Sequence, residues 1–99
     1  MKKLNQLLSL VPHHLEKGNL DLSVSGITAD SRVVTLGSVF VAIRGVQTDG
    51  HQFIHHAISK GASCIICESI VPDIPDQICV IKVENASLFH QHGHLRHRL

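Results

Sequence analysis

The sequence contains three short runs of aliphatic residues, at residues 39–43, 64–67 and 78–83, with hardly a polar side chain among them. A strand that is apolar on both sides has to be covered on both of its faces, which is typical of parallel sheets. Between the first two runs lies a segment with helical spacing, and a strand, a helix and a strand in that order imply a right-handed crossover with parallel pairing. The sequence therefore predicts an α/β fold, a small layered sandwich whose mostly parallel or mixed sheet is flanked by helices.

Further elements are expected before and between these runs. Apolar residues at helical spacing predict an amphipathic helix over residues 4–11. Residues 20–27 alternate between apolar and polar side chains, which predicts a strand with one wet face at an edge of the sheet. A second helix is predicted around an apolar stripe in residues 53–58, with Asp49 as its cap and Gly61 at its end.

Composition limits the chain to one core and excludes several classes of function. Its 99 residues suffice for a single core, and 43% of them are hydrophobic, which argues against disorder. The formal net charge is only +1 and aromatic residues make up 3%, so neither a phosphate-backbone footprint nor a stacking platform for nucleic acid is expected. No apolar run approaches the roughly 20 residues that span a membrane, and the start of the chain makes a poor signal peptide. We therefore expect a cytoplasmic protein with no nucleic-acid or membrane partner.

The three cysteines of the chain, Cys64, Cys67 and Cys79, lie inside the aliphatic runs. An odd number of thiols in such surroundings favours reduced, buried cysteines over a disulfide framework. Cys64 and Cys67 have the spacing of some metal and redox sites, but residues three apart in a strand point to opposite faces. We therefore expect these two cysteines to be structural and not to share a metal ion.

Histidines raise a second metal hypothesis. His51 and His55 are four residues apart on the predicted second helix, so their rings could reach one metal ion. No H-E-x-x-H arrangement is present there, so solvated surface histidines are the preferred interpretation and no metal ligand is assigned. Residues 87–99 carry four further histidines and differ in composition from the rest. We interpret residues 1–86 as the domain and residues 87–99 as an atypical His-rich tail that is disordered or non-native.

Two polar segments follow predicted strands, at residues 28–32 and 44–50. Glycine and small polar residues let main-chain N–H groups converge on a phosphate or a nucleobase, and the second segment runs into a helix N-terminus, which favours anions. Arg32 and Arg44 could add a fork of donors to a diphosphate. The alternative interpretation is that both segments are ordinary turns beside a capped helix.

Motifs for nucleotide hydrolysis and for nucleophilic catalysis are missing from the sequence. It contains no G-x-x-x-x-G-K-[ST] phosphate loop, no G-x-G-x-x-G and no G-x-S-x-G nucleophile turn. The chain alone is therefore not expected to hydrolyse ATP, and no catalytic residue is assigned.

The two polar segments belong to a longer pattern. It comprises D-S-R at residues 30–32, G-x-x-F-V-A at residues 37–42, and T-D-G-H at residues 48–51 followed by a helix. In order and spacing this pattern resembles the N-terminal domain of the bacterial Mur ligases, above all the ligases that add the third residue to the peptidoglycan stem peptide. The resemblance extends over about the first 86 residues and ends where the atypical tail begins.

This resemblance implies a role for the domain. In Mur ligases it holds the uridine diphosphate part of UDP-N-acetylmuramoyl-dipeptide, while later domains bind ATP and magnesium and bring the amino acid. The parent protein would be an ATP-dependent amino-acid ligase, a UDP-N-acetylmuramoyl-tripeptide synthetase. Because the phosphate loop of the ATP domain is absent from these 99 residues, we expect them to bind substrate, to hold no cofactor and to be inactive without the remaining domains.

By position, the resemblance also implies the contact residues. Ala29 and Ser31 would lie on one side of the nucleotide, with Val46, Gln47 and Thr48 on the other. Ser31 would donate its hydroxyl proton to a phosphate or ribose oxygen, and the main chain of the second group would read the edge of the uracil. The residues implied to support these contacts are Asp30, Arg32 and Arg44.

Two alternatives stay open. The related ligase that adds the terminal dipeptide has a similar N-terminal domain, although residues 48–51 and 83–85 favour the third-residue ligase. A non-catalytic interaction or regulatory module could also have kept this fold and lost the ligand.

Overall fold

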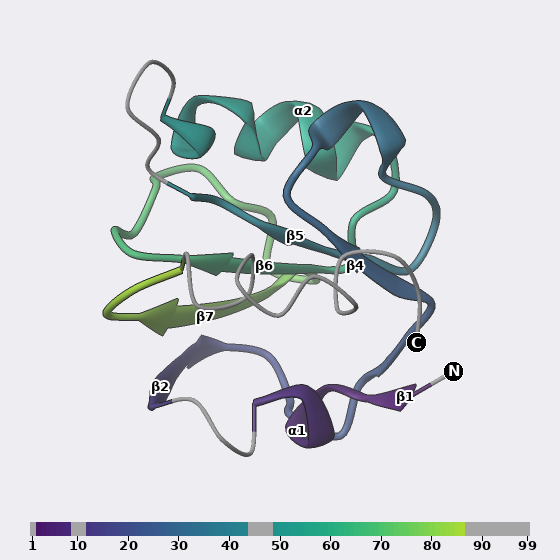
Figure 1. Ribbon diagram of the computed structural model, residues 1–99, viewed down its shortest axis with the longest axis vertical. Coiled ribbons are helices and arrows are strands. Elements are labelled where there is room, and N and C mark those ends of the chain that lie inside the picture. Colours follow the sequence, from purple (N-terminus) through teal and green to yellow (C-terminus); the bar gives the residue numbers. More distant parts are fainter. Residues whose placement is uncertain (1, 9–11, 44–48, 87–99) are drawn as a thin grey trace.

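The computed structural model describes residues 2–8, 12–43 and 49–86. Its elements follow one another along the chain as β1 (Lys2–Lys3), α1 (Leu4–Leu7), β2 (His13–Lys17), β3 (Ser23–Val24), β4 (Gly26–Thr28), the 3-10 turn η1 (Ser31–Val33), β5 (Ser38–Val41), the 3-10 turn η2 (Gly50–Phe53), α2 (Ile54–Ser59), β6 (Cys64–Cys67) and β7 (Cys79–Val83). A five-stranded sheet has the order β2, β7, β6, β5, β4 (Figure 1). Strands β1 and β3 pair in a separate two-stranded sheet.

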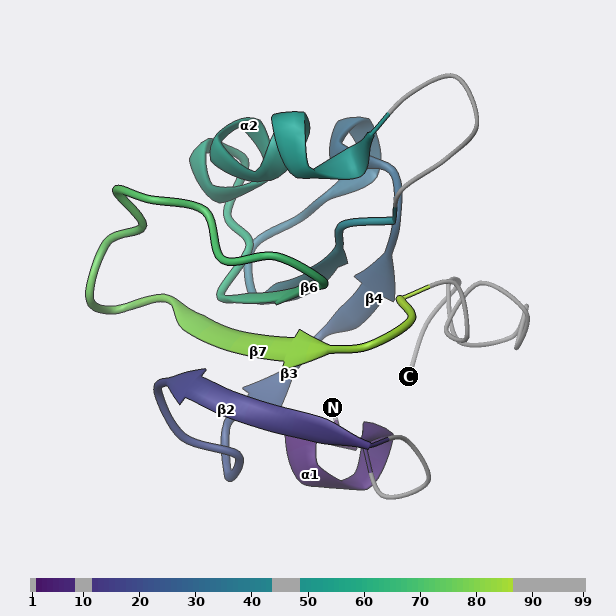
Figure 2. The same ribbon diagram turned by 90° about the vertical axis from the view of Figure 1, so that its left-hand side faces the viewer.

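The five-stranded sheet is mixed. Strands β4, β5, β6 and β7 run parallel to one another, whereas β2 is antiparallel to β7. Every residue of β5 and β6 is buried, because α2 covers one face of the sheet and α1 lies with β1 and β3 against the other (Figures 1 and 2). The structure confirms the predicted α/β sandwich and places a strand at each of the three aliphatic runs.

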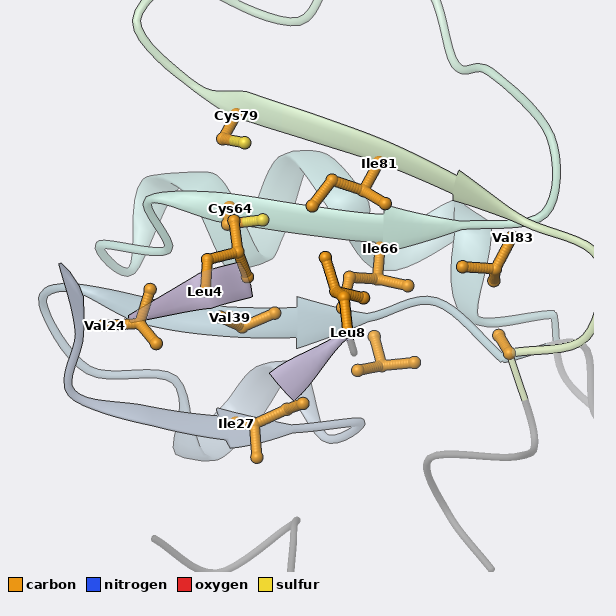
Figure 3. Close-up of a cluster of buried hydrophobic side chains, with 12 residues drawn as sticks. Leu4, Leu8, Val24, Ile27, Val39, Cys64, Ile66, Cys79, Ile81 and Val83 are labelled. Carbon is orange, nitrogen blue, oxygen red and sulfur yellow. The ribbon is translucent and has the colours of Figure 1, made fainter. Parts of the chain in front are cut away.

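Alternate residues of the buried strands supply two separate clusters of apolar side chains. On the α1 side, Cys64 belongs to a cluster with Leu4 and Leu8, and none of the three is exposed (Figure 3). On the α2 side, Cys67 belongs to a cluster with Phe40. Cys64 and Cys67 therefore face opposite sides of the sheet, as predicted, and all three cysteines are buried and free.

The prediction of a single strand over residues 20–27 is wrong, because the strand is interrupted at Ser25. There the N–H group donates to the carbonyl oxygen of Gly37 at 3.0 Å, and Oγ donates to the carbonyl oxygen of Leu36, also at 3.0 Å. The part before the break is β3, which pairs with β1, and the part after it is β4, which pairs with β5. The edge position predicted for this segment holds for β4 in the five-stranded sheet.

Two further differences concern the beginning of the chain. The first helix was predicted over residues 4–11, but α1 ends at Leu7 with Leu8 as its C-cap, since one turn is enough to bury Leu4 and Leu8 against the sheet. Residues 9–11 lie outside the described part of the chain. Strand β2 was not predicted at all, because its side chains are mostly exposed and no apolar alternation marks it.

The second helix ends as predicted, but a 3-10 turn stands between its predicted cap and α2, which begins at Ile54. Asp49 caps η2 by accepting a hydrogen bond from the N–H group of His51 at 2.9 Å, and α2 continues the turn to Ser59. Gly61 then adopts φ +114°, a left-handed conformation that glycine tolerates best. None of the described helices is long and apolar enough to cross a membrane.

Candidate functional site

The described part of the candidate site lies where β4 and β5 end. Residues 29–31 follow β4 directly, and Ile43 and Asp49 flank the undescribed segment after β5. Neighbouring parallel strands end at the same edge of a sheet, and this edge is where open α/β sheets bind their ligands. The predicted site residues that lie outside the described part of the chain are Arg44, Val46, Gln47 and Thr48.

Ser31 places a buried hydroxyl at this edge. The residue opens η1 and is only 7% exposed. Its Oγ lies 3.0 Å from Nδ1 of His56, which α2 contributes. The turn between β4 and η1 is fixed by Thr28, whose Oγ1 accepts a hydrogen bond from the N–H group of Asp30 at 3.0 Å. His56 stands 25 residues after Ser31, so no sequence pattern pointed to their contact.

Asp30 and Arg32 stabilise the same turn by hydrogen bonds at its solvent-exposed side. The Asp30 carboxylate accepts hydrogen bonds from the Arg32 N–H group at 2.9 Å, from Nε at 3.0 Å and from Nη2 at 2.9 Å. The side-chain and main-chain bonds from Arg32 lower the pKa of the Asp30 carboxyl to about 2. Nε and Nη2 of Arg32 thus both donate to the Asp30 carboxylate. Ala29 connects β4 to this turn and is partly buried.

Replacing Asp30 with asparagine should lower the free energy of unfolding by less than about 1 kcal/mol at neutral pH, because asparagine can still cap the turn and only the exposed ion pair with Arg32 is lost. The folded-state pKa of about 2 lies below the ordinary value of 3.8, so the carboxylate stabilises the fold above about pH 4 and ceases to do so as the pH falls toward 2. Urea unfolding at several pH values should therefore show the difference from wild type shrinking on acidification. Asp21→Asn, at an exposed site, is the matched control. An equal difference at pH 2 and pH 7 would contradict the prediction.

His51 connects the start of η2 to the turns after β6 and β7. Its Nδ1 lies 2.6 Å from Oδ1 of Asp49, and its Nε2 accepts hydrogen bonds from the N–H groups of Glu68 and Ser69, each at 3.1 Å. Because two N–H groups donate to Nε2, the ring proton sits on Nδ1 and is donated to Asp49. Oε2 of Glu68 in turn accepts from the N–H group of Ala86 at 2.7 Å. One network thus joins three segments at the edge of the sheet that carries the candidate site.

This network overturns the two interpretations of His51 made from the sequence. Both of its ring nitrogens are engaged in hydrogen bonds, whereas His55 is exposed on α2, so the two residues do not form a metal-binding pair. Nor is His51 a solvated surface residue, since its side chain is only 10% exposed. Within the described part of the chain, no group of three or more potential ligand side chains is arranged to hold a metal ion.

The fold is a small α/β sandwich with polar turns at the carboxyl ends of its parallel strands, the edge at which open α/β sheets bind ligands when they have one. Comparison with known protein families identifies the family to which this domain belongs. Residues 23–94 match the Mur ligase family, catalytic domain. The match spans well over half of the chain, so the chain belongs to the Mur ligase family, which confirms the resemblance found in the sequence.

Curated relatives are of the type to which the sequence pattern pointed. The UDP-N-acetylmuramoyl-L-alanyl-D-glutamate--2,6-diaminopimelate ligase of Bacteroides thetaiotaomicron is 40% identical over 83 residues, which cover 84% of this chain and 17% of that protein. The UDP-N-acetylmuramyl-tripeptide synthetase of Borreliella burgdorferi is 38% identical over 90 residues, covering 88% of this chain and 18% of that protein. The chain therefore spans less than one fifth of the length of these relatives.

Solved structures share the fold. The chain superimposes on MurF from Acinetobacter baumannii with a TM-score of 0.75 and 23% identity, over 87% of this chain and 18% of that one. It also matches MurF ligase from Thermotoga maritima in complex with ADP, with a TM-score of 0.56 and 35% identity, over 67% of this chain and 15% of that one.

Proposed function

We propose that residues 1–86 form the uridine-nucleotide-binding domain of an ATP-dependent amide ligase of peptidoglycan synthesis. The domain would hold the UDP part of UDP-N-acetylmuramoyl-dipeptide while further domains add the third residue of the stem peptide. Membership in the Mur ligase family carries this proposal, and the names of the curated relatives, which act on UDP-N-acetylmuramoyl substrates, support it. ATP and magnesium would serve the parent enzyme and not these residues, in keeping with the ADP in the Thermotoga structure.

The buried hydroxyl of Ser31 supports the proposed position of the nucleotide. It is held at the carboxyl edge of the sheet, and the contacts around Asp30 keep its turn rigid. Ala29 and Ser31 would flank one side of the nucleotide, and the segment 46–48 would flank the other. Anchoring a remote nucleotide helps an amide ligase because binding energy far from the reacting carboxylate positions that carboxylate for attack.

Titration of the 99-residue chain with UDP, followed by amide chemical shifts, tests the proposal. We expect binding in the millimolar range, with shifts concentrated at residues 29–31 and 46–48. Ser31→Ala should weaken binding about fivefold, which corresponds to about 1 kcal/mol for one lost neutral hydrogen bond. Ser23→Ala, at an exposed position of β3, is the matched control and should bind as wild type does. ADP should bind more weakly than UDP if the segment 46–48 reads the uracil.

A chain that leaves its amide shifts unchanged in UDP would favour the alternative of an interaction or regulatory module that has lost the ligand. Shifts confined to another surface would equally contradict the proposed site. The ligase that adds the terminal dipeptide is the second candidate for the parent enzyme, because the Thermotoga MurF ligase is 35% identical to this chain over the matched part.

A further inference from the structure

We propose that His56 is a positioning residue for the uridine nucleotide: by donating from Nδ1 to Oγ of Ser31, it leaves the Ser31 hydroxyl proton for an acceptor oxygen of the ligand. The inference rests on the proposed function, since it assigns a task to a residue beside the proposed nucleotide site. It concerns a side chain that neither the sequence pattern nor the family resemblance singled out.

The geometry that carries the inference is the contact between α2 and η1. Nδ1 of His56 and Oγ of Ser31 are 3.0 Å apart, which is hydrogen-bond distance. Ser31 is nearly buried, whereas His56 is exposed, so the contact joins a buried hydroxyl to a residue at the surface. Moving this ring or changing its protonation state acts directly on the hydroxyl group.

The chemistry of a hydroxyl group makes the direction of this bond decisive. A serine side chain has one proton to donate and two lone pairs with which to accept. If Nδ1 carries no proton, it takes the Ser31 proton, and the hydroxyl then presents only lone pairs to a ligand. If Nδ1 carries a proton, it donates to Oγ, and the Ser31 proton is free to point elsewhere.

A uridine diphosphate selects between these two states. Its phosphate, ribose and carbonyl oxygens are acceptors, and the phosphate oxygens carry negative charge, so they repel lone pairs and bind donors. The nucleotide should therefore bind the state in which Nδ1 of His56 is protonated and Ser31 is the donor. In that state the Nδ1–H group of His56 occupies a lone pair of Oγ, so the Ser31 proton is directed away from His56 and toward the ligand.

Three variants and one spectroscopic measurement test the proposal. In UDP titrations, His56→Leu should weaken binding about fivefold, because it removes the hydrogen bond and keeps the bulk. His56→Asn should restore affinity to within about twofold, since the asparagine side-chain amide can donate where Nδ1 did. His55→Leu, the neighbouring exposed histidine, is the control and should bind UDP as wild type does. In protein labelled with nitrogen-15 at histidine, Nδ1 of His56 should resonate in the protonated range when UDP is saturating.

The possible results separate this inference from the function on which it rests. If the wild-type chain does not bind UDP at Ser31, the proposed function fails. If wild type binds there but His56→Leu binds equally well, the function stands and the role of His56 is overturned. The role is also overturned if asparagine fails to restore affinity, or if Nδ1 of His56 carries no proton in the UDP complex. Melting curves of the three variants check that the fold is kept, and the resonance measurement on wild type is independent of any loss of stability.

Discussion

Replacing His51 with phenylalanine should lower the free energy of unfolding by about 3 kcal/mol. The change keeps a ring of similar shape but removes the acceptor for two main-chain N–H groups, those of Glu68 and Ser69. A buried donor left without a partner costs about 1–3 kcal/mol, and the bond to Asp49 is lost as well. For a chain of this size the melting temperature should fall by about 12 °C or more.

Thermal unfolding monitored by circular dichroism measures this effect. His55→Phe is the matched control, because it makes the same chemical change four residues later at an exposed position. Its melting temperature should stay within a few degrees of wild type. Comparable losses in the two variants would mean that the aromatic ring itself, and not the loss of the network, destabilises the chain.

Gly50→Ala should destabilise the chain by about 3 kcal/mol for a steric reason. A Cβ atom at this position would lie 2.7 Å from the nitrogen and 2.9 Å from the oxygen of Ile43. Both are main-chain atoms that cannot rotate away, and the Gly50 N–H group already donates to that oxygen at 2.8 Å. The two chain segments must therefore separate, which breaks this hydrogen bond and disturbs the packing beside it.

Gly26→Ala provides the comparison for this prediction. An added Cβ at Gly26 meets nothing within 4 Å, so the change in stability should be below about 0.5 kcal/mol. Urea unfolding of both variants gives the difference directly. Equal stabilities for the two alanine variants would contradict the close approach of Gly50 to Ile43.

The central strands could be predicted because a strand that is buried on both faces has a continuous run of apolar residues in the sequence. Strands β5, β6 and β7 coincide with the three aliphatic runs, and the opposite orientations of Cys64 and Cys67 follow from strand geometry alone. Asp49 and Gly61 also act where helix capping predicts them. In each case the residue that local preferences favour is also the residue that the tertiary structure requires at that position.

The edges of the fold were harder to predict because little of their sequence is buried. In β2 the apolar Leu15 is only partly buried, so the strand depends on main-chain pairing with β7, which any sequence can supply. The break at Ser25 depends on a hydrogen bond to Gly37, twelve residues later, and the alternation of residues 20–27 conceals it. Pairing over such distances is decided by the completed sheet and not by the local pattern.

In the candidate site, too, local contacts could be predicted from the sequence and contacts between distant elements could not. The turn around Asp30, Ser31 and Arg32 could be located from its motif because its hydrogen bonds are local. The contacts of Ser31 with His56 and of His51 with the turn after β6 could not, because each joins elements that only the folded sheet brings together. The roles of the predicted contact residues themselves stay predictions.

The position of β2 has a consequence for how the protein is made. β2 is synthesised before the other strands of the five-stranded sheet, whereas its partner β7 is the last of the described strands. Pairs such as Lys17 and Val80 can therefore form only after β7 has been synthesised. Because a ribosome delivers the chain from its N-terminus, we expect the parallel strands to assemble first while the early segment stays unpaired. Its docking then closes the open edge of β7 and protects it from other nascent chains. We therefore expect the first part of the sheet to be translated to be the last to join it.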